Sequence, residues 1–375
     1  MKLRVELSSI ATHSISGVGH YTKRLAEALD KSPDTETNGV YFNFLHRQPI
    51  PNISLKKPAT GNPFFPLRVY AKLQSFNIAP PFDFLLPRAD ITIFPNFATW
   101  PTIRSKLRAT TIHDLTYVHF PELVEDKNLA HLRRVVPRSV KKADLILTVS
   151  ESVKAELVEH FGLDPDRCVV TSIPPEPEYF ATNNNEIHKK YGIPTEKFIF
   201  FIGNLEPRKN LSTLVEAYQL LPDDLKKEYS LVLAGGKGWK TEKSKQAIQK
   251  AQDAGEQVVH IGYADQADAP ALFQKASVFV MPSFYEGFGM PLLEAMAGKT
   301  PVVTSDIPVM RETAGSAALY ADPNDAAGFA VHIETILRSP DVVNKLNDEA
   351  ARQLTKVSWE NNAAKIVRRT KELLV

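Results

Sequence analysis

Cysteine is nearly absent from this chain of 375 residues, in which Cys168 stands alone. A disulfide within the chain needs a second cysteine, and metal sites built from cysteine need several. Both are therefore excluded, and the composition fits a reducing compartment.

Long hydrophobic runs are also missing. No apolar run reaches the roughly 18 residues that argue for a membrane-spanning helix. The opening stretch MKLRVELSSIATHSIS lacks the continuous apolar segment of an export signal. We expect a soluble, cytoplasmic protein that neither spans a membrane nor is exported.

Common nucleotide-binding fingerprints are incomplete in this sequence. Gly17 and Gly19 form a G-x-G sequence before a helical pattern, without the third glycine of a dinucleotide site. The Gly-Lys-Ser/Thr ending of a P-loop is missing too. By itself the G-x-G predicts only a loop that presses against a phosphate or a sugar.

What remains is ordinary globular composition, with 43% apolar and 23% charged residues. A chain of this length exceeds the roughly 250–300 residues at which one core stops growing, so two domains are expected. Short β-rich segments alternate with helical patterns, and most of them are apolar throughout. Strands of that kind are buried on both faces by helices, so we expect two doubly wound, Rossmann-like parallel sheets that face a cleft. The segments that we interpret as strands are LRVELSS, VYFNFLH, ADITIFP, RATTIHD, ADLILTVS, KFIFFIGN, YSLVLAGG, QVVHIGY, ASVFVMPS and TPVVTSD.

A linker is expected at residues 174–194. Three prolines within four positions, Pro174, Pro175 and Pro177, cannot donate to a sheet, and residues 183–185, all asparagine, are typical of a loop. This gives an N-terminal domain at 1–173 and a C-terminal domain at 195–357, followed by a closing segment at 358–375.

Positive charge is concentrated in residues 47–108, which hold nine Lys or Arg against two acidic residues, for a local net charge of +7. Aromatic residues are interleaved with these cations. Such a stretch suits anionic lipid head groups or a phosphate-bearing acceptor, although a solvated surface above buried aromatics explains it equally well. No nucleic-acid motif accompanies it, and we expect no nucleic-acid partner.

The stretch FYEGFGMPLLEAMAG contains two acids around a glycine turn that follows an expected strand. Pro291 should open the next helix, so that the amides of Phe288, Gly289 and Met290 point at an anion with the helix dipole behind them. Glu294 on that helix can accept hydrogen bonds from a ribose, and Glu286 is left to face sugar hydroxyls. As a structural alternative, both acids could be a cap and a surface residue.

The stretch FIGNLEPRKNLSTL places Arg208 and Lys209 between an expected strand and a helix. Gly203 allows close backbone approach, and two cations at a helix start can clamp a diphosphate. His113 and Asp114 end another strand, where an acid-oriented imidazole suits acceptor binding or proton handling.

Weaker candidates are His119 and Glu122, which follow in the next loop. The Asp-Pro-Asp sequence at 164–166 has the form of a metal site, but it lies where a turn is expected, so we expect no metal ligand there.

These segments, above all FIGNLEPRKN, LVLAG, HIGY and SFYEGFGMPLLEAMAGKTPVV, resemble the retaining glycosyltransferases of family 4, which have the GT-B fold. The likeness covers nearly all of residues 196–325 and continues more loosely in SGVGHYT and TIHDL. In the linker, SIPPEPEYF replaces the family's Asn-Gly-Val-Asp turn. The resemblance implies that residues 358–375 form a helix returning to the first domain.

The resemblance also assigns roles to the residues singled out above. It implies that Arg208 and Lys209 bind a diphosphate, with Gly203 as a further donor-binding residue. It also implies that Arg208, Lys209, Glu286 and His113 are the catalytic residues. Further roles are ribose binding by Glu294, donor-sugar contact by Glu286, donor contact by Gly17, Gly19, Phe288, Gly289 and Met290, and acceptor binding near the reaction centre by His113 and Asp114. Tyr263, after Gly262, is expected at the base.

The implied reaction is transfer of a hexosyl unit from a nucleoside diphosphate sugar to an acceptor hydroxyl, with retention and without a metal or other cofactor. The N-terminal segments look closest to bacterial polysaccharide mannosyltransferases, which favours GDP-mannose as donor and a glycan or polyprenyl-diphosphate-linked glycan as acceptor. The basic stretch would then hold the enzyme peripherally at the inner face of the plasma membrane. A UDP-sugar donor, an epimerase of the same fold, an inverting or glycogen-type transferase and a non-catalytic binding module remain alternatives.

Overall fold

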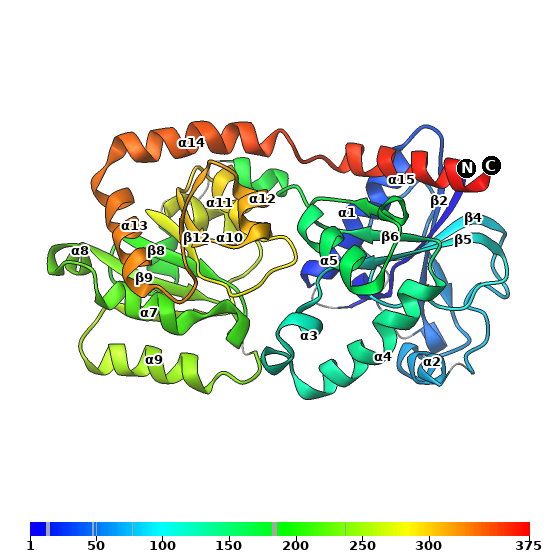
Figure 1. Ribbon diagram of the computed structural model, residues 1–375, viewed down its shortest axis with the longest axis horizontal. Helices are drawn as coiled ribbons and strands as arrows, with labels where there is room; N and C mark the ends of the chain where they lie inside the picture. The colour runs from blue at the N-terminus through cyan, green and yellow to red at the C-terminus, as the bar shows by residue number, and fades with distance from the viewer. Residues whose placement is uncertain (13–15, 47–48, 50, 77, 182–185, 237) are drawn as a thin grey trace. The chain divides into compact units, whose positions relative to one another are not determined.

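The computed structural model describes residues 1–12, 16–46, 49, 51–76, 78–181, 186–236 and 238–375 (Figure 1). Arg47, the first cation of the basic stretch 47–108, and the asparagines at 183–185 lie outside these residues. The described chain divides into two compact units. The first holds Met1–His119, Asp126–Ile173 and Ser358–Val375, and the second holds Phe120–Glu125 and Pro174–Val357. Residues 120–125, expected in the N-terminal domain, thus belong to the second unit.

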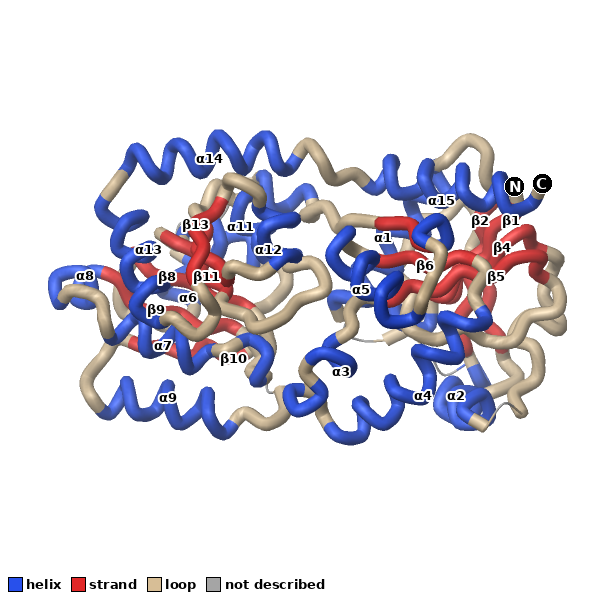
Figure 2. Tube along the Cα trace, viewed as in Figure 1, coloured by secondary structure: helices blue, strands red, loops and turns tan. Residues whose placement is uncertain are grey.

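The first unit contains a seven-stranded sheet in the order β3-β2-β1-β4-β5-β6-β7, in which the pairs are parallel. Since crossover connections are right-handed, the runs from β1 to β3 and from β4 to β7 place their helices on opposite faces (Figure 2). The strands are β1 (Lys2–Glu6), β2 (Glu36–Phe42), β3 (Thr60–Asn62), β4 (Ala89–Phe94), β5 (Ser105–Ile112), β6 (Leu145–Thr148) and β7 (Cys168–Val170). The helices are α1 (Gly17–Lys31), α2 (Leu67–Ser75), α3 (Thr116–His119), α4 (Asp126–Lys142), α5 (Glu151–Phe161) and α15 (Trp359–Leu374).

The second unit contains a six-stranded parallel sheet in the order β10-β9-β8-β11-β12-β13. Its strands are β8 (Lys197–Ile202), β9 (Tyr229–Ala234), β10 (Val258–Gly262), β11 (Val278–Met281), β12 (Val302–Ser305) and β13 (Ala318–Ala321). Its helices are α6 (Ile187–Lys190), α7 (Leu211–Gln219), α8 (Asp223–Glu228), α9 (Glu242–Asp253), α10 (Ala269–Lys275), α11 (Met290–Ala297), α12 (Pro308–Ala314), α13 (Ala326–Arg338) and α14 (Pro340–Leu354). The expected α/β fold with two doubly wound parallel sheets is confirmed.

Strand β8 shows why both faces of the second sheet are apolar. Ile199 and Phe201 point into a core shared with α7 and α13, whereas Phe200 meets Phe273 of α10 edge to face with ring centroids 5.2 Å apart. Successive side chains of a strand alternate between its faces, so a strand covered on both sides must be apolar at every position.

In the part of the chain that the structure describes, no helix combines the length and the apolar character needed to cross a bilayer.

Candidate functional site

The candidate site of the second unit lies where its strand order changes direction, between β8 and β11. In an open parallel sheet the connections diverge at that point and leave room for a ligand beyond the carboxyl ends of the strands. A short turn (Pro207–Lys209) follows β8, and the loop to α11 follows β11. This topology brings Lys209 and Glu286 together across 77 positions of sequence.

Arg208, Lys209 and Glu286 form one hydrogen-bonded cluster. The ammonium of Lys209 donates to Glu286 Oε1 at 2.7 Å, and the guanidinium of Arg208 donates to Glu286 Oε2 and to the carbonyl of Tyr285. Arg208 also donates to Glu206 Oε1 at 2.8 Å. Both cations are therefore held by directional bonds before any ligand binds.

Glu286 differs from the expectation that it is left to face sugar hydroxyls. Its side chain is buried, which by itself would raise its pKa, but Arg208 and Lys209 overcome that effect and lower the pKa to about 2. The reason is the strand order, because β8 and β11 are neighbours and the loops that follow them lie side by side. Glu286 is thus an ionised carboxylate whose oxygens are occupied by the two cations.

Glycines allow the backbone to pack closely beneath the cluster. A Cβ on Gly235, after β9, would lie 1.8 Å from the carbonyl oxygen of Gly203, after β8. A Cβ on Gly203 would lie 3.3 Å from Cε of Lys209. Gly203 therefore leaves room for the aliphatic stem of Lys209.

Helix α11 begins at Met290, so Pro291 is its second residue rather than its first. Gly289 caps the helix at φ 87°, in the left-handed region that glycine adopts without strain. The carbonyl of Phe288 accepts a hydrogen bond from the hydroxyl of Thr313, which holds this loop. The first backbone N–H groups of α11 point out of the helix at the positive end of its dipole.

Glu294 lies further along α11 and is also buried. Burial raises its pKa to about 7, although a hydrogen bond with the hydroxyl of Tyr179 acts in the opposite direction. Tyr179 comes from the linker turn Pro177–Phe180 and packs against Phe273. Tyr179 was not predicted from the sequence, in which the replaced linker motif was the only signal and indicated no partner.

Tyr263 follows the last residue of β10, Gly262, which has φ 71°. Its side chain is 67% exposed, which leaves a ring face available for stacking. Unlike Arg208 and Glu286, it lies at the far edge of the sheet, because β10 is the edge strand.

His113 lies in the first unit, directly after β5. Its Nε2 is 2.8 Å from the carbonyl oxygen of Pro95, so Nε2 carries the proton and the lone pair is on Nδ1. Burial lowers the pKa of His113, which keeps the ring neutral near pH 7. The ring of Tyr21 meets it edge to face at 5.0 Å, a contact that the sequence did not suggest.

Gly17 and Gly19 lie within the first turn of α1 rather than in a loop before it, and Ser16 caps that helix. This differs from the expected glycine turn, because the capping hydroxyl of Ser16 accepts from the amide of Gly19 and starts the helix earlier. Tyr21, on the same helix, links this turn to His113.

The remaining acidic and histidine candidates have structural partners. Asp114 accepts from the amide of Thr116 at 2.9 Å and His119 pairs with Glu156 at 3.3 Å. Asp164 accepts from the amide of Asp166 at 2.9 Å, as a turn former does. Glu122 belongs to the second unit, where its backbone carbonyl accepts from Lys240.

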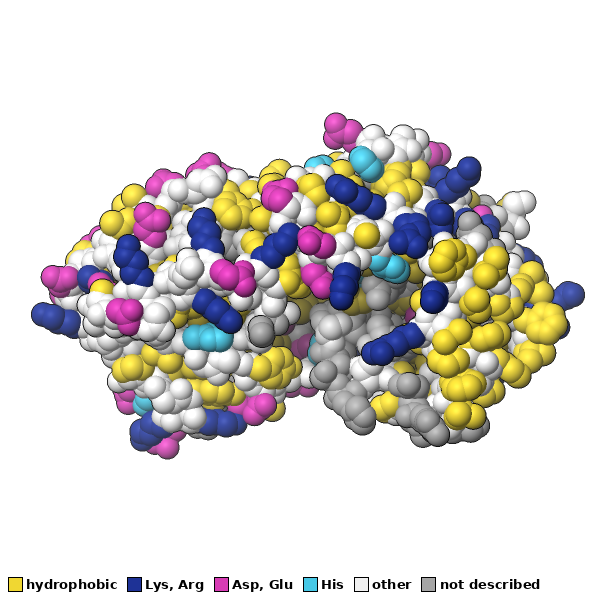
Figure 3. Space-filling view, turned by 90° about the horizontal axis from the view of Figure 1, so that it is seen from below, with side chains coloured by type: hydrophobic (Ala, Val, Ile, Leu, Met, Phe, Trp, Pro, Cys, Tyr) yellow, Lys and Arg dark blue, Asp and Glu magenta, His cyan; other side chains and the backbone are white. Residues whose placement is uncertain are grey.

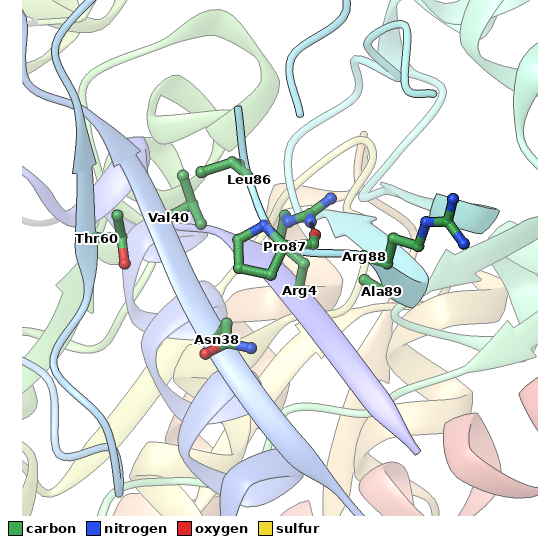
Figure 4. Close-up of a pocket in the computed structure, with 8 residues that line it drawn as sticks. All are labelled: Arg4, Asn38, Val40, Thr60, Leu86, Pro87, Arg88 and Ala89. Carbon is green, nitrogen blue, oxygen red and sulfur yellow. Dashed lines mark hydrogen bonds between the residues drawn. The ribbon is translucent and has the colours of Figure 1, made fainter. Parts of the chain in front are cut away.

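A separate pocket of about 40 Å³ lies in the first unit (Figure 4). It lies toward the amino-terminal ends of the strands, away from their carboxyl ends, because Asn38 and Ala89 come early in β2 and β4. The guanidinium of Arg4 is occupied there by the buried Asp83, by Thr92 and by Ser105. Arg88 extends away from the others. We therefore regard this pocket as structural.

Comparisons with known proteins bear on the family and the fold. The family described as glycosyl transferases group 1 matches residues 183–353, and the family described as Glycosyltransferase Family 4 matches residues 15–173. O-antigen chain mannosyltransferase B of Escherichia coli is 30% identical over 362 residues, covering 93% of this chain and 94% of that protein.

Two further comparisons extend the likeness. O-antigen chain mannosyltransferase RfbU of Salmonella typhimurium is 28% identical, covering 68% of this chain and 67% of its own length. Among solved structures, HepE of Anabaena in complex with UDP and glucose superposes with a TM-score of 0.71 at 16% identity, covering 99% of this chain and all of its own. The last comparison concerns the fold alone.

Proposed function

Since this chain belongs to the family 4 and group 1 glycosyltransferases, we propose that it transfers a mannosyl unit from GDP-mannose, with retention and without a metal ion. The acceptor is a hydroxyl of a glycan, free or linked to polyprenyl diphosphate, in the synthesis of a bacterial surface polysaccharide. Two relatives named as O-antigen mannosyltransferases support the sugar and the pathway. We place the enzyme in the cytoplasm, peripherally at the inner face of the plasma membrane.

The cluster of Arg208, Lys209 and Glu286 carries this proposal. Two carboxylates, Glu206 and Glu286, offset the two cations, so the site attracts a diphosphate through directional N–H donors more than through net charge. The ammonium of Lys209 has three N–H donors, and its bond to Glu286 Oε1 uses one of them. The positive end of α11 adds backbone donors for the same group.

In the proposed reaction the bond from the anomeric carbon to the diphosphate oxygen breaks, and a bond to the acceptor oxygen forms on the same face. The acceptor proton passes to the leaving phosphate oxygen. Negative charge grows on the diphosphate as the bond breaks, and the fixed donors of Arg208 and Lys209 stabilise it. Glu294 holds the ribose hydroxyls, and Tyr263 stacks on the base.

The first unit supplies the acceptor side of the proposal. His113 is neutral, and the hydrogen bond at its Nε2 leaves the lone pair on Nδ1. This Nδ1 accepts a hydrogen bond from an acceptor or sugar hydroxyl. Asp114 holds the loop that follows the histidine. The helix start at Gly17 and Gly19 adds backbone donors.

Donor binding and product analysis test the proposal. We expect Lys209→Ala to weaken GDP-mannose binding about 10- to 100-fold, the effect of a lost charge-assisted hydrogen bond. Arg338→Ala is the matched control, since Arg338 forms an exposed ion pair in the same unit. The protein should release α-linked mannoside in the presence of a chelator.

Several results would contradict parts of this proposal. Unchanged donor affinity of Lys209→Ala would rule out the diphosphate clamp. Activity restored only by Mg²⁺ or Mn²⁺ would rule out metal independence. Preference for UDP-sugars would replace the donor, and conversion of the donor without acceptor would indicate an epimerase.

A further inference from the structure

Exposed apolar side chains gather on one part of the first unit, beside Lys and Arg side chains (right of the view in Figure 3). Five of them define what we name the apolar patch: Phe76, Ile78, Phe84, Leu85 and Ile103, which are each between 57% and 67% exposed. Single exposed apolar residues need no explanation, but a group of large ones marks an interaction surface.

Hydrogen bonds hold the segments of the apolar patch together. The amide of Ile103 donates to Asp83 Oδ1 at 2.8 Å, which joins the loop that carries Phe84 to the loop before β5. The amide of Ile78 donates to the carbonyl of Leu73 in α2, and the hydroxyl of Tyr70 in α2 donates to Pro80 O at 2.8 Å.

Beneath these segments lies a core of aromatic rings. Phe82 and Tyr70 both pack against Trp100, with ring centroids 5.2 and 5.3 Å apart. Tyr70, Phe82 and Trp100 are buried, whereas Phe76 and Phe84, from the same stretch of sequence, are exposed. The apolar patch is therefore a supported surface, and burial of aromatics explains only part of the composition of this stretch.

Four cations come from the same stretch of chain as the apolar patch and have no acidic partner among the described residues. Arg68, Lys72, Arg88 and Arg104 are exposed, and none forms an ion pair with an acid among the described residues. Arg68, Lys72 and Phe76 follow one another at intervals of four, which places them on one side of α2 and its end. The two acids of the region are engaged elsewhere, Asp83 with Arg4 and Asp90 with Lys106.

We propose that the apolar patch and these four cations dock the protein on an anionic bilayer. The apolar side chains enter the interface between head groups and acyl chains, and the cations contact lipid phosphates. Uniform negative charge over a plane complements a surface on which unpaired cations lie beside apolar side chains. The inference deepens the proposed function, since a polyprenyl-linked acceptor resides in that bilayer.

Vesicle binding tests the proposal, using phosphatidylcholine vesicles with and without phosphatidylglycerol. One variant combines Phe76→Ser with Phe84→Ser, and another combines Arg68→Glu with Lys72→Glu. The matched controls lie in the second unit: Leu220→Ser with Val331→Ser, at 55% and 59% exposure, and Lys243→Glu with Lys245→Glu, both exposed on α9.

We expect the protein to sediment with the anionic vesicles and to remain in solution with the neutral ones. The charge variant should lose binding about tenfold or more at low salt, because each cation near an anionic surface contributes on the order of a fivefold gain. The apolar variant should lose binding at low and high salt alike. Both controls should bind as the unaltered protein does.

Equal binding to both kinds of vesicle, or equal losses in patch and control variants, would overturn the proposal. Concentration-dependent dimerisation that Phe76→Ser with Phe84→Ser abolishes, without vesicle binding, would assign the surface to a second copy instead. Thermal unfolding confirms that each variant is folded. Donor binding by the second unit is measured separately, so a failed docking surface is distinguishable from a failed glycosyl transfer.

Discussion

Two glutamates of one loop and helix, Glu286 and Glu294, acquire opposite acidities. Both are buried, and burial raises the pKa of a carboxyl group. Glu286 meets two cations that reverse the effect and bring its pKa to about 2. At Glu294 the hydrogen bond from Tyr179 does not offset burial and the nearby charge of Glu176, and the pKa is raised to about 7. At neutral pH the first is a fixed anion, whereas the second titrates in this pH range.

The titration of Glu294 makes donor binding and stability depend on pH. We expect donor affinity to rise as pH increases through about 7, because an ionised carboxylate accepts hydrogen bonds from both ribose hydroxyls. Because the pKa of Glu294 is higher in the folded protein than in the unfolded chain, the protonated carboxyl group stabilises the fold at pH values below the unfolded-state pKa. That stability is lost as the pH rises through the folded-state pKa, by an amount on the order of 3 kcal/mol. Glu294→Gln should flatten both profiles.

Calorimetric titration with GDP at several pH values measures the affinity, and denaturant unfolding measures the stability. Glu6 in the first unit, whose burial raises its pKa to about 7, titrates in the same window, so the difference between the protein and Glu294→Gln is the informative quantity. Tyr179→Phe should move the affinity profile to higher pH, since it removes the hydrogen bond that lowers the pKa. An unshifted profile would show that Tyr179 does not act on Glu294.

Residue identities could be predicted from the sequence better than their partners. Arg208 and Lys209 lie after a strand and before a helix, as the local pattern required. Their pairing with Glu286 could not be foreseen, because it depends on β8 and β11 being neighbours, which is a property of strand order. Tyr179 could not be predicted for a related reason, since its hydrogen bond with Glu294 joins the linker to α11.

At the level of elements, the loops after β8 and β9 are joined backbone to backbone. We expect Gly235→Ala to destabilise the second unit by more than about 3 kcal/mol, because its Cβ would overlap a carbonyl oxygen that cannot move without displacing β8. Gly255→Ala is the matched control, with φ 83° and open space around the Cβ. It should cost only about 1–2 kcal/mol of left-handed strain. Denaturant unfolding compares the two, and equal losses would contradict a steric origin.

The strands could be predicted because parallel strands buried on both faces are apolar at every position. The short edge strands β3, β7 and β13 were missed, since three or four residues leave too little pattern to recognise. The boundary between core and surface in residues 64–104 was also beyond the sequence. Tyr70 and Phe76 belong to one amphipathic segment, and only its packing decides which aromatic side chain is buried.

In the molecule as a whole, the first unit contains both the first and the last residues of the sequence, and the second unit is formed by residues between them. Helix α15 ends the chain but belongs to the first unit, where Asn362 donates to the carbonyl of Ser172 at 2.6 Å and Trp359 meets the ring of Tyr21 at 5.8 Å. Ile366, in the same helix, is fully buried. The first core is therefore completed only by the last residues of the sequence.

This arrangement predicts which unit a mutation at the end of the chain destabilises. Ile366→Ala and Ile333→Ala remove the same group from fully buried sites in the first and second units, and each should cost about 2–5 kcal/mol. Calorimetry with and without GDP identifies the transition of the second unit, because a ligand raises the unfolding temperature of the unit that binds it. Ile366→Ala should lower the transition that GDP leaves unchanged, and Ile333→Ala the one that GDP raises. If both variants lowered one common transition equally, the two units would unfold as a single cooperative body.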